Sequence, residues 1–342
     1  MSNQPPIEVP QGAIRLNTDS QRLEFFAQDR WYEMATEEAS GIGNRGFRVS
    51  GTGAGATLIE TFNITSLGNS HDTGFDLSTS RGAFGCSASR TRAIIAGGNA
   101  PGVSNSNDIQ YFEMTALSNT IDFGDLTAVM AESGAHSNNV RFLITGAASS
   151  ANNVINFLTV ASTGSAQDFG DQGNSLSSVT SCGSPTRGLF AGGAIPSVVN
   201  IIEFVTIAST GNSVDFGDLT VARYSAGAGS NNTRGLFFMG NAGSPTNQVN
   251  TIDFVTKAST GNAQDFGDSS MSDTGGPTQG PGICASPNRI VFFGGYITGG
   301  TDRTTEMQFV NPTHKGDSTR FGDLETAQNS DGNGLSSSHG GL

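Results

Sequence analysis

The chain has 342 residues, and 30 acidic residues against 17 lysines and arginines give it a formal net charge of −13 at pH 7. Lys257 and Lys315 are its only lysines, and no basic cluster occurs, which argues against a surface that binds nucleic-acid phosphates. No apolar run approaches the roughly 20 residues of a membrane span. The start MSNQPPIEVPQG lacks the basic and apolar regions of a secretory signal, so we expect a soluble protein made in the cytosol.

The first 35 residues precede a repeating pattern and have their own composition. Residues 12–19 and 21–26 alternate around Thr18-Asp19-Ser20, which predicts a β-hairpin, and residues 30–34 predict a third short strand with the only tryptophan, Trp31. So short a segment cannot support an independent core. We therefore expect residues 1–35 to pack on the rest of the chain, on copies of themselves or on a partner.

From residue 36 onward the sequence repeats about every 47 residues. The marker is the tripeptide FGD, complete in five copies and degenerate in the first, with its phenylalanine at positions 75, 123, 169, 216, 266 and 321. A fixed period of this length indicates one supersecondary unit copied in series. Six copies of a residue usually make one structural contact six times, so these positions predict cohesion and not catalysis.

Each repeat contains four short segments: the first consists of small residues, and those that follow are rich in Val, Ile, Phe and Thr, which is strand composition. In the copy at 181–220 the last two segments flank Ser209-Thr210-Gly211-Asn212, and the Gly-Asn pair predicts a two-residue hairpin turn. Four antiparallel strands per unit match one blade of a β-propeller. We therefore predict an all-β, six-bladed propeller over residues 36–342, with seven blades or an open arc as alternatives. In this fold Phe216→Ala costs about 3–5 kcal/mol.

An arginine opens the second segment of every repeat, at positions 45, 92, 141, 187, 234 and 289. One interpretation is a ring of guanidinium groups that binds an anion. The other, which we favour, is that each arginine pairs with an aspartate of an FGD segment, because bidentate pairing with carboxylates suits this side chain.

The end of the chain supplies one more first segment. Residues 326–342 align with a first segment, centred on Asn333-Gly334-Leu335-Ser336, so this surplus strand either closes the ring against the first blade or is displaced outward. Cys86, Cys182 and Cys284 occupy corresponding positions about a repeat apart, which predicts buried thiols without disulfides.

No motif predicts a catalytic, cofactor-binding or metal-binding residue, and we expect no enzyme activity. Paired aspartates such as Asp215 and Asp218 could bind calcium, but no known calcium-loop pattern surrounds them, and capping of turns is the favoured interpretation. The four histidines lack metal-ligand spacing. Glycosidase carboxylates gathered at a propeller axis remain an alternative.

The chain shows three resemblances, and the second and third together cover nearly its whole length. The glycine doublets at 97–98, 192–193 and 294–295 resemble the kelch repeat, although the Tyr and Trp that follow the doublet in kelch blades are absent. The stretch TRGLFAGG…NIIEFVTIASTGNSVDFGDLTVAR at 186–223 resembles repeats in virion proteins of marine and cyanobacterial bacteriophages. The N-terminal GAIRLNTDSQRLEFFAQDRWYEM is similar to a short module near the attachment ends of phage tail fibres.

These resemblances imply a structural or adhesive protein on a virion surface. We expect a tail fibre or spike that docks to other virion proteins through residues 1–35, forms a homo-oligomer and presents the propeller to a host-surface glycan or receptor. The polar segments 99–107, 194–200 and 240–250 would suit such contact, because loops on a rigid scaffold carry recognition. The alternatives are a head decoration protein, a glycan-cleaving depolymerase and an intracellular kelch-type adaptor.

Overall fold

The structure is a computed structural model of the whole chain. It describes residues 10, 12–17, 22–27, 30–33, 44–49, 57–100, 102, 105–146, 152–194, 196–243, 248–271, 278–297, 303–326 and 333–342. Internal contacts divide the chain into two units, Met1–Gly41 and Ile42–Leu342. The boundary expected between residues 35 and 36 lies outside the described ranges. No helix within those ranges has the length and apolar character needed to span a membrane.

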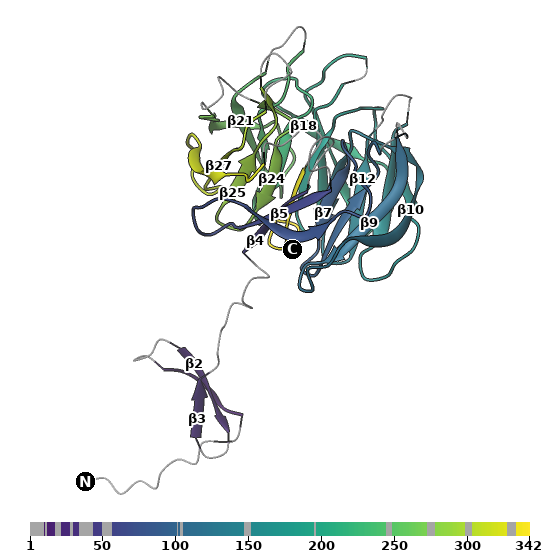
Figure 1. Cartoon of the computed structure of the whole chain (residues 1–342). Helices are drawn as coiled ribbons and strands as arrows, with labels where there is room; N and C mark the ends of the chain where they lie inside the picture. Colours follow the sequence, from purple (N-terminus) through teal and green to yellow (C-terminus); the bar gives the residue numbers. More distant parts are fainter. Residues whose placement is uncertain are drawn as a thin grey trace, which may run out of the picture. The chain divides into compact units, whose positions relative to one another are not determined.

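The N-terminal unit contains a three-stranded antiparallel sheet of β1 (Ile14–Asn17), β2 (Arg22–Ala27) and β3 (Arg30–Glu33) (Figure 1). The expected hairpin and the third strand are therefore present, while the turn at residues 18–20 lies outside the described ranges. On this sheet Arg15 pairs with Glu24 at 2.7 Å, and its guanidinium lies 4.1 Å from the ring centre of Trp31. These cross-strand contacts stabilise a small sheet that lacks a large core.

The second unit is all-β and consists of six four-stranded antiparallel blades. The strands of the first three blades, from first to fourth, are β29 (Asn333–Ser336), β4 (Arg45–Val49), β5 (Leu58–Asn63), β6 (His71–Asp76); β7 (Gly85–Ala88), β8 (Arg92–Ala96), β9 (Ser106–Glu113), β10 (Ile121–Met130); β11 (Gly134–Ser137), β12 (Arg141–Thr145), β13 (Val154–Thr159), β14 (Gln167–Asp171). The strands of the last three are β15 (Thr180–Gly183), β16 (Arg187–Ala191), β17 (Ile201–Thr206), β18 (Val214–Asp218); β19 (Gly227–Ser230), β20 (Arg234–Phe238), β21 (Thr251–Thr256), β22 (Gln264–Asp268); β24 (Gly282–Ala285), β25 (Ile290–Phe293), β27 (Glu306–Val310), β28 (Thr319–Asp323). A small additional sheet pairs β23 (Thr278–Gln279) with β26 (Tyr296–Ile297).

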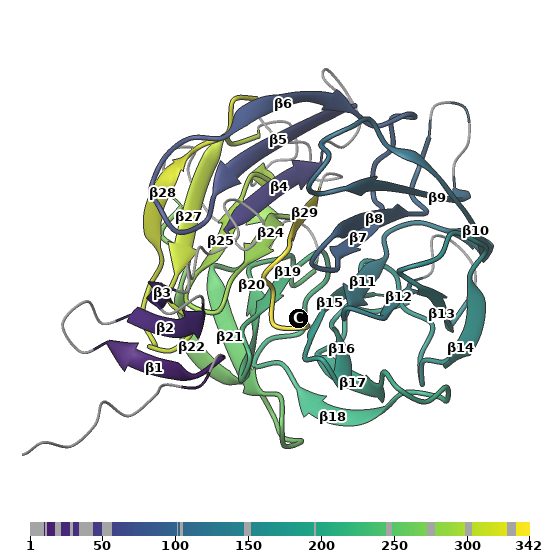
Figure 2. The same ribbon diagram turned by 90° about the horizontal axis from the view of Figure 1, so that it is seen from below.

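The ring closes through the end of the chain. The first strands contact one another around the axis in the order β29, β7, β11, β15, β19 and β24, and β24 in turn contacts β29. Strand β29 pairs antiparallel with β4, so a strand near the end of the chain becomes the first strand of the blade that begins the propeller (Figure 2). This confirms the six-bladed propeller and decides between the two alternatives for the surplus strand. Closure also pairs edges that would otherwise be exposed.

The FGD motif forms a β-bulge on the fourth strand. In the fourth blade Ile202 pairs with Gly217 and Glu203 pairs with Asp215, which leaves Phe216 as the extra residue. The same shift leaves Phe123, Phe169, Phe266 and Phe321 unpaired. Bulges redirect a side chain, and all five phenylalanines are at most 4% exposed. The motif therefore serves packing, as its repetition predicts.

The Gly-Asn pairs do not form the predicted two-residue turns. Strands β17 and β18 are separated by seven residues, 207–213, and Gly211 has φ of +155°. This loop docks on the neighbouring blade: the Gly211 N–H donates to the Phe169 carbonyl at 2.7 Å, and the Asp171 N–H donates to Asn212 Oδ1 at 3.0 Å. A Cβ on Gly170 would lie 2.4 Å from the Gly211 carbonyl oxygen, so the FGD glycine lets the two backbones approach.

Candidate functional site

The repeated arginines do not pair with the FGD aspartates, and that prediction was wrong. The Arg187 guanidinium lies 4.8 Å from the ring centre of Phe204 and donates from Nη1 to the carbonyl of Lys257 in the next blade at 2.9 Å. Equivalent bonds join further blades, including the closing junction: Arg92 to Val160, Arg141 to Ile207, Arg234 to Pro312 and Arg289 to Ile64. In these five blades the guanidinium lies over an aromatic ring of the third strand and reaches across the junction. These bonds use the arginines in blade cohesion.

The aspartates that precede FGD in two blades cap backbone groups. Asp168 Oδ1 accepts from the N–H of Gly170 at 2.9 Å, and Asp122 Oδ1 accepts from Gly124 at 3.0 Å. This is the capping favoured from the sequence. Within the described ranges no group of three or more metal-ligating side chains converges. The three cysteines are buried and free, as predicted, and burial raises the pKa of each thiol.

A further repeated contact was missed in the sequence. In five blades one buried polar side chain of the third strand accepts a hydrogen bond from the preceding blade: Glu60, Asn156, Glu203, Asp253 and Gln308. In the second blade Gln110 accepts from the Thr120 hydroxyl of its own blade, and that hydroxyl accepts from the Ser78 N–H of the preceding blade. In the fifth blade the Thr220 hydroxyl and N–H both donate to the carboxylate of Asp253. A polar residue recurring in an apolar strand at the repeat spacing was the available signal. Buried polar groups need partners, and here the neighbouring blade supplies them.

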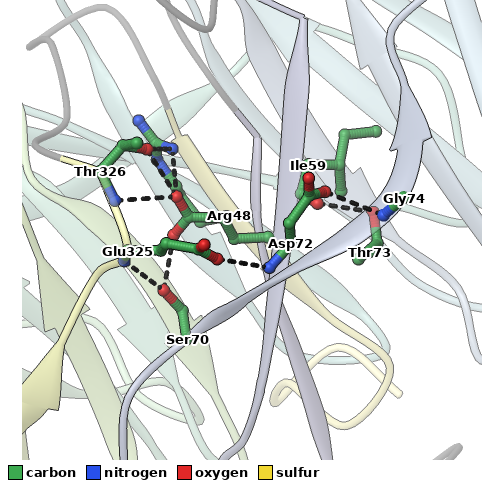
Figure 3. A network of polar contacts seen from close by, with 9 residues as sticks. Arg48, Ile59, Ser70, Asp72, Thr73, Gly74, Glu325 and Thr326 are labelled. Carbon is green, nitrogen blue, oxygen red and sulfur yellow. Dashed lines mark hydrogen bonds and ion pairs between the residues drawn. The ribbon is translucent and has the colours of Figure 1, made fainter.

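At the ring-closing junction a buried arginine joins this contact (Figure 3). Arg48 is 2% exposed and donates to Glu60 Oε1 at 2.9 Å and to the Thr326 hydroxyl at 2.9 Å. Ser70 donates to the other Glu60 oxygen at 2.5 Å and accepts from the Glu325 N–H at 3.0 Å. Residues 325 and 326 lead from the last blade toward β29, so this network fixes the chain where the ring closes.

The side chains that differ between blades surround a cavity on the propeller axis. This cavity has a volume of about 420 Å³ and lies where the first strands begin. Its polar lining is mainly hydroxyl and amide groups, among them Asn99, Ser133, Ser177, Thr180, Tyr224 and Gln279. Glu132 is the one charged residue among the lining residues that the structure describes. Its carboxylate accepts a hydrogen bond from the Ser178 hydroxyl at 2.7 Å.

A backbone collar forms the mouth of this axial cavity. Two residues before each of five first strands the chain adopts a left-handed conformation: Ala83, Glu132, Ser178, Ser225 and Gly280, with φ between +49° and +66°. Neighbouring collar residues bond to each other, since Glu132 N–H donates to the Ala83 carbonyl at 2.6 Å and Ser225 N–H donates to Ser178 at 3.0 Å. The collar holds adjacent blades at a fixed separation around the axial cavity.

The segments proposed for recognition begin at the same mouth. Asn99 pairs with Gly82, Ala194 with Ser177, and Asn241 with Tyr224, and most of these residues line the axial cavity. Parts of the three segments, 101, 103–104, 195 and 244–247, lie outside the described residues. Their described parts place the start of each loop around one opening, on the face where fourth strands lead to the next first strands.

The opposite end of the axis is filled by the C-terminal segment, residues 337–342, which lies near the centre of the ring in Figure 2. The Gly340 N–H donates to the Ser230 carbonyl at 2.8 Å. Lys257 is 2% exposed and donates to three carbonyls, those of Gly183, Asn231 and Gly340. The corresponding residues of other blades are apolar, namely Ile64, Met114, Val160, Ile207 and Pro312. Lys257 thus ties the C-terminal segment to two blades.

Two histidines that looked unrelated in the sequence meet beside this lysine. The rings of His136 and His339 lie 5.7 Å apart, and His339 Nε2 bonds to the Ala88 carbonyl at 2.5 Å. Burial, with a smaller contribution from the nearby Lys257, lowers the pKa of His136 well below its usual range and that of His339 to about 4. Burial also lowers the pKa of Lys257 to about 8, while its three carbonyl partners match the three hydrogens of an ammonium group. Both imidazoles are therefore neutral at pH 7.

Comparison with known proteins gave no relative. No protein-family model matches the chain, and no curated protein matches its sequence.

Proposed function

We propose that this protein is a structural component of a bacteriophage particle, of the tail fibre or spike type. In this proposal residues 1–35 attach it to other virion proteins. The propeller presents its axial cavity and the surrounding loops to the host surface. A homo-oligomer on the virion surface would repeat this presentation and strengthen weak binding through multivalency.

The observation that carries the proposal is that the repeated and the non-repeated residues of the propeller have different roles. Repeated residues such as Arg187, Phe216 and Asp253 are used in contacts between or within blades. The polar side chains around the axial cavity differ from blade to blade. A rigid repeated body with one variable face is suited to display and recognition, and the resemblance of the repeats to phage virion proteins supplies the setting.

The geometry favours binding over glycan cleavage. Glycoside hydrolysis generally uses two carboxyl groups about 5–10 Å apart. Among the described residues that line the axial cavity, Glu132 is the one carboxylate. The depolymerase alternative would need a second acid in the same cavity. Incubating the protein with host-surface polysaccharide tests it, because new reducing ends would establish cleavage and overturn a purely adhesive role.

Locating the chain on intact particles tests the proposal itself. An antibody raised against the propeller should label tail-associated structures in electron micrographs, and quantitative mass spectrometry should find the chain in tens of copies per particle. Label distributed over the head, with copies in the hundreds, would instead establish a head decoration protein. Particles that lack the chain would overturn any virion role.

A further inference from the structure

We infer that the axial cavity is a binding site for a neutral saccharide unit. This inference deepens the proposed function, on which its biological meaning rests, by assigning a class of ligand to the presented face. It concerns the cavity bounded by the collar at its mouth and by the first strands along its walls.

The size of the axial cavity suits a small molecule. Its volume of about 420 Å³ falls within the roughly 300–1,000 Å³ typical of small-molecule sites. The C-terminal segment fills the far end of the axis, where Gly340 bonds to Ser230 and Lys257. A ligand therefore enters from the loop face and meets a closed floor.

Two polar atoms in the cavity wall have no hydrogen-bond partner among the described residues. They are Oγ of Ser133 and Oδ1 of Asn99, which line the cavity from neighbouring blades. Ser133 is 8% exposed, so its hydroxyl is largely withdrawn from bulk water. A buried polar atom without a partner costs about 1–3 kcal/mol. Both atoms lie beneath the cavity surface, so a ligand hydroxyl can bond to them only after the Asn99 and Ser133 side chains rotate toward the cavity.

The charge and composition of the lining select the ligand class. Hydroxyl and amide groups match a polyhydroxylated ligand, because both partners donate and accept. Tyr224 offers an aromatic face with a polar tip, as sugar sites commonly do. Glu132 can accept from a pair of sugar hydroxyls, and together with the net charge of −13 it disfavours acidic sugars. These features together point to a neutral hexose or N-acetylhexosamine.

The collar explains why such a site would be preformed. Left-handed φ values at the non-glycine residues Ala83, Glu132 and Ser178 cost on the order of 1 kcal/mol or more each. Bonds between blades hold them in place, including Glu132 to Ala83 and Ser225 to Ser178. A cavity rim fixed by its scaffold loses little freedom when a ligand binds.

Saturation-transfer NMR and calorimetry on the full chain test the inference with a panel of sugars. The panel comprises glucose, galactose, N-acetylglucosamine, their disaccharides, and glucuronic acid as the acidic comparator. We expect saturable binding of at least one neutral sugar, with glucuronic acid bound at least about tenfold more weakly. Glu132→Gln and Tyr224→Ala should each weaken binding by about tenfold, as loss of a charged hydrogen bond or a stacking contact predicts. Asp265→Asn, the same charge change at an exposed site on β22, should leave binding unchanged.

The thermal unfolding midpoint of each variant shows whether a loss of sugar binding is caused by a loss of folding. Variants that retain the parent midpoint yet lose sugar binding support the inference. No saturable binding to any neutral sugar, or binding that Glu132→Gln and Tyr224→Ala leave intact, overturns it. Sugar binding by a chain that is absent from virions would overturn the proposed function and leave the site standing. Presence of the chain in virions without any sugar binding would overturn the inference about the cavity and leave the proposed function intact.

Discussion

The outer part of the propeller and its axis use the same repeat in opposite ways. At the periphery the contact is nearly identical at successive junctions: a loop glycine bonds to an FGD phenylalanine carbonyl, as Gly211 does to Phe169 and Gly261 does to Phe216. At the axis the corresponding positions diverge, so that Lys257 stands where other blades have apolar residues. Repetition therefore marks cohesion in this molecule, and departures from repetition mark the positions available for closure and recognition.

The largest effect should come from removing a repeated phenylalanine. Phe216 is 2% exposed and packs at 5.8 Å between ring centres against Phe204, so Phe216→Ala leaves a cavity that should cost about 3–5 kcal/mol of unfolding free energy. Guanidinium denaturation with fluorescence or circular dichroism detection measures it. Val214→Ala on the same strand is the control, because Val214 is 59% exposed. Equal losses in both variants would contradict the packing role of the FGD motif.

Acid should lower the unfolding free energy chiefly through the two histidines at the axis. The pKa of His339 is lowered to about 4 in the folded protein, whereas an unfolded histidine titrates near 6.5. The unfolded state therefore binds more protons between these values, so stability is lost as pH falls from about 6.5 toward 4. His339 alone should contribute on the order of 2 kcal/mol of loss at pH 5, and His136, whose pKa is also lowered, adds to it.

Denaturation curves at pH 7 and pH 5 measure this loss. His339→Gln keeps a donor for the Ala88 carbonyl and removes the titration, so it should reduce the difference between the two pH values. His314→Gln is the control, because His314 is exposed. A pH difference that His339→Gln leaves unchanged would show that other groups, and not this histidine beside Lys257, govern acid sensitivity.

The arginine contacts should have an intermediate effect. Arg187→Met removes a bond to the Lys257 carbonyl and the stacking on Phe204, which together should cost about 1–2 kcal/mol. Arg187→Lys should recover part of this loss. Arg90→Met removes the same charge from an exposed side chain and should change the unfolding free energy little. If Arg187→Met and Arg90→Met behave alike, the guanidinium does not hold the blades together.

The repeat alone predicted the fold, since the positions of Arg187 and Phe216 and their copies define six four-stranded units. Where a contact lies within one repeat, as in the capping of Gly170 by Asp168, the sequence was sufficient. The partner of Arg187 was predicted wrongly because that contact crosses to the next blade. The meeting of His136 with His339 depends on ring closure, which no local pattern encodes. No local pattern encodes the axial cavity either, because all six blades contribute to its wall.

The smallest predicted effect distinguishes one junction from the others. Asn212 accepts a hydrogen bond from the Asp171 N–H, and Asn69, Asn119, Asn262 and Asp317 do the same at other junctions. The corresponding residue of the third blade is Ser165, which makes no such bond among the described residues. Asn212→Ser should therefore lower the unfolding free energy by about 0.5–1 kcal/mol, and Ser165→Asn should raise it by a similar amount. Opposite shifts in the denaturation midpoint would establish that this loop residue joins the blades, whereas shifts of the same sign would assign the effect to the loop's own conformation.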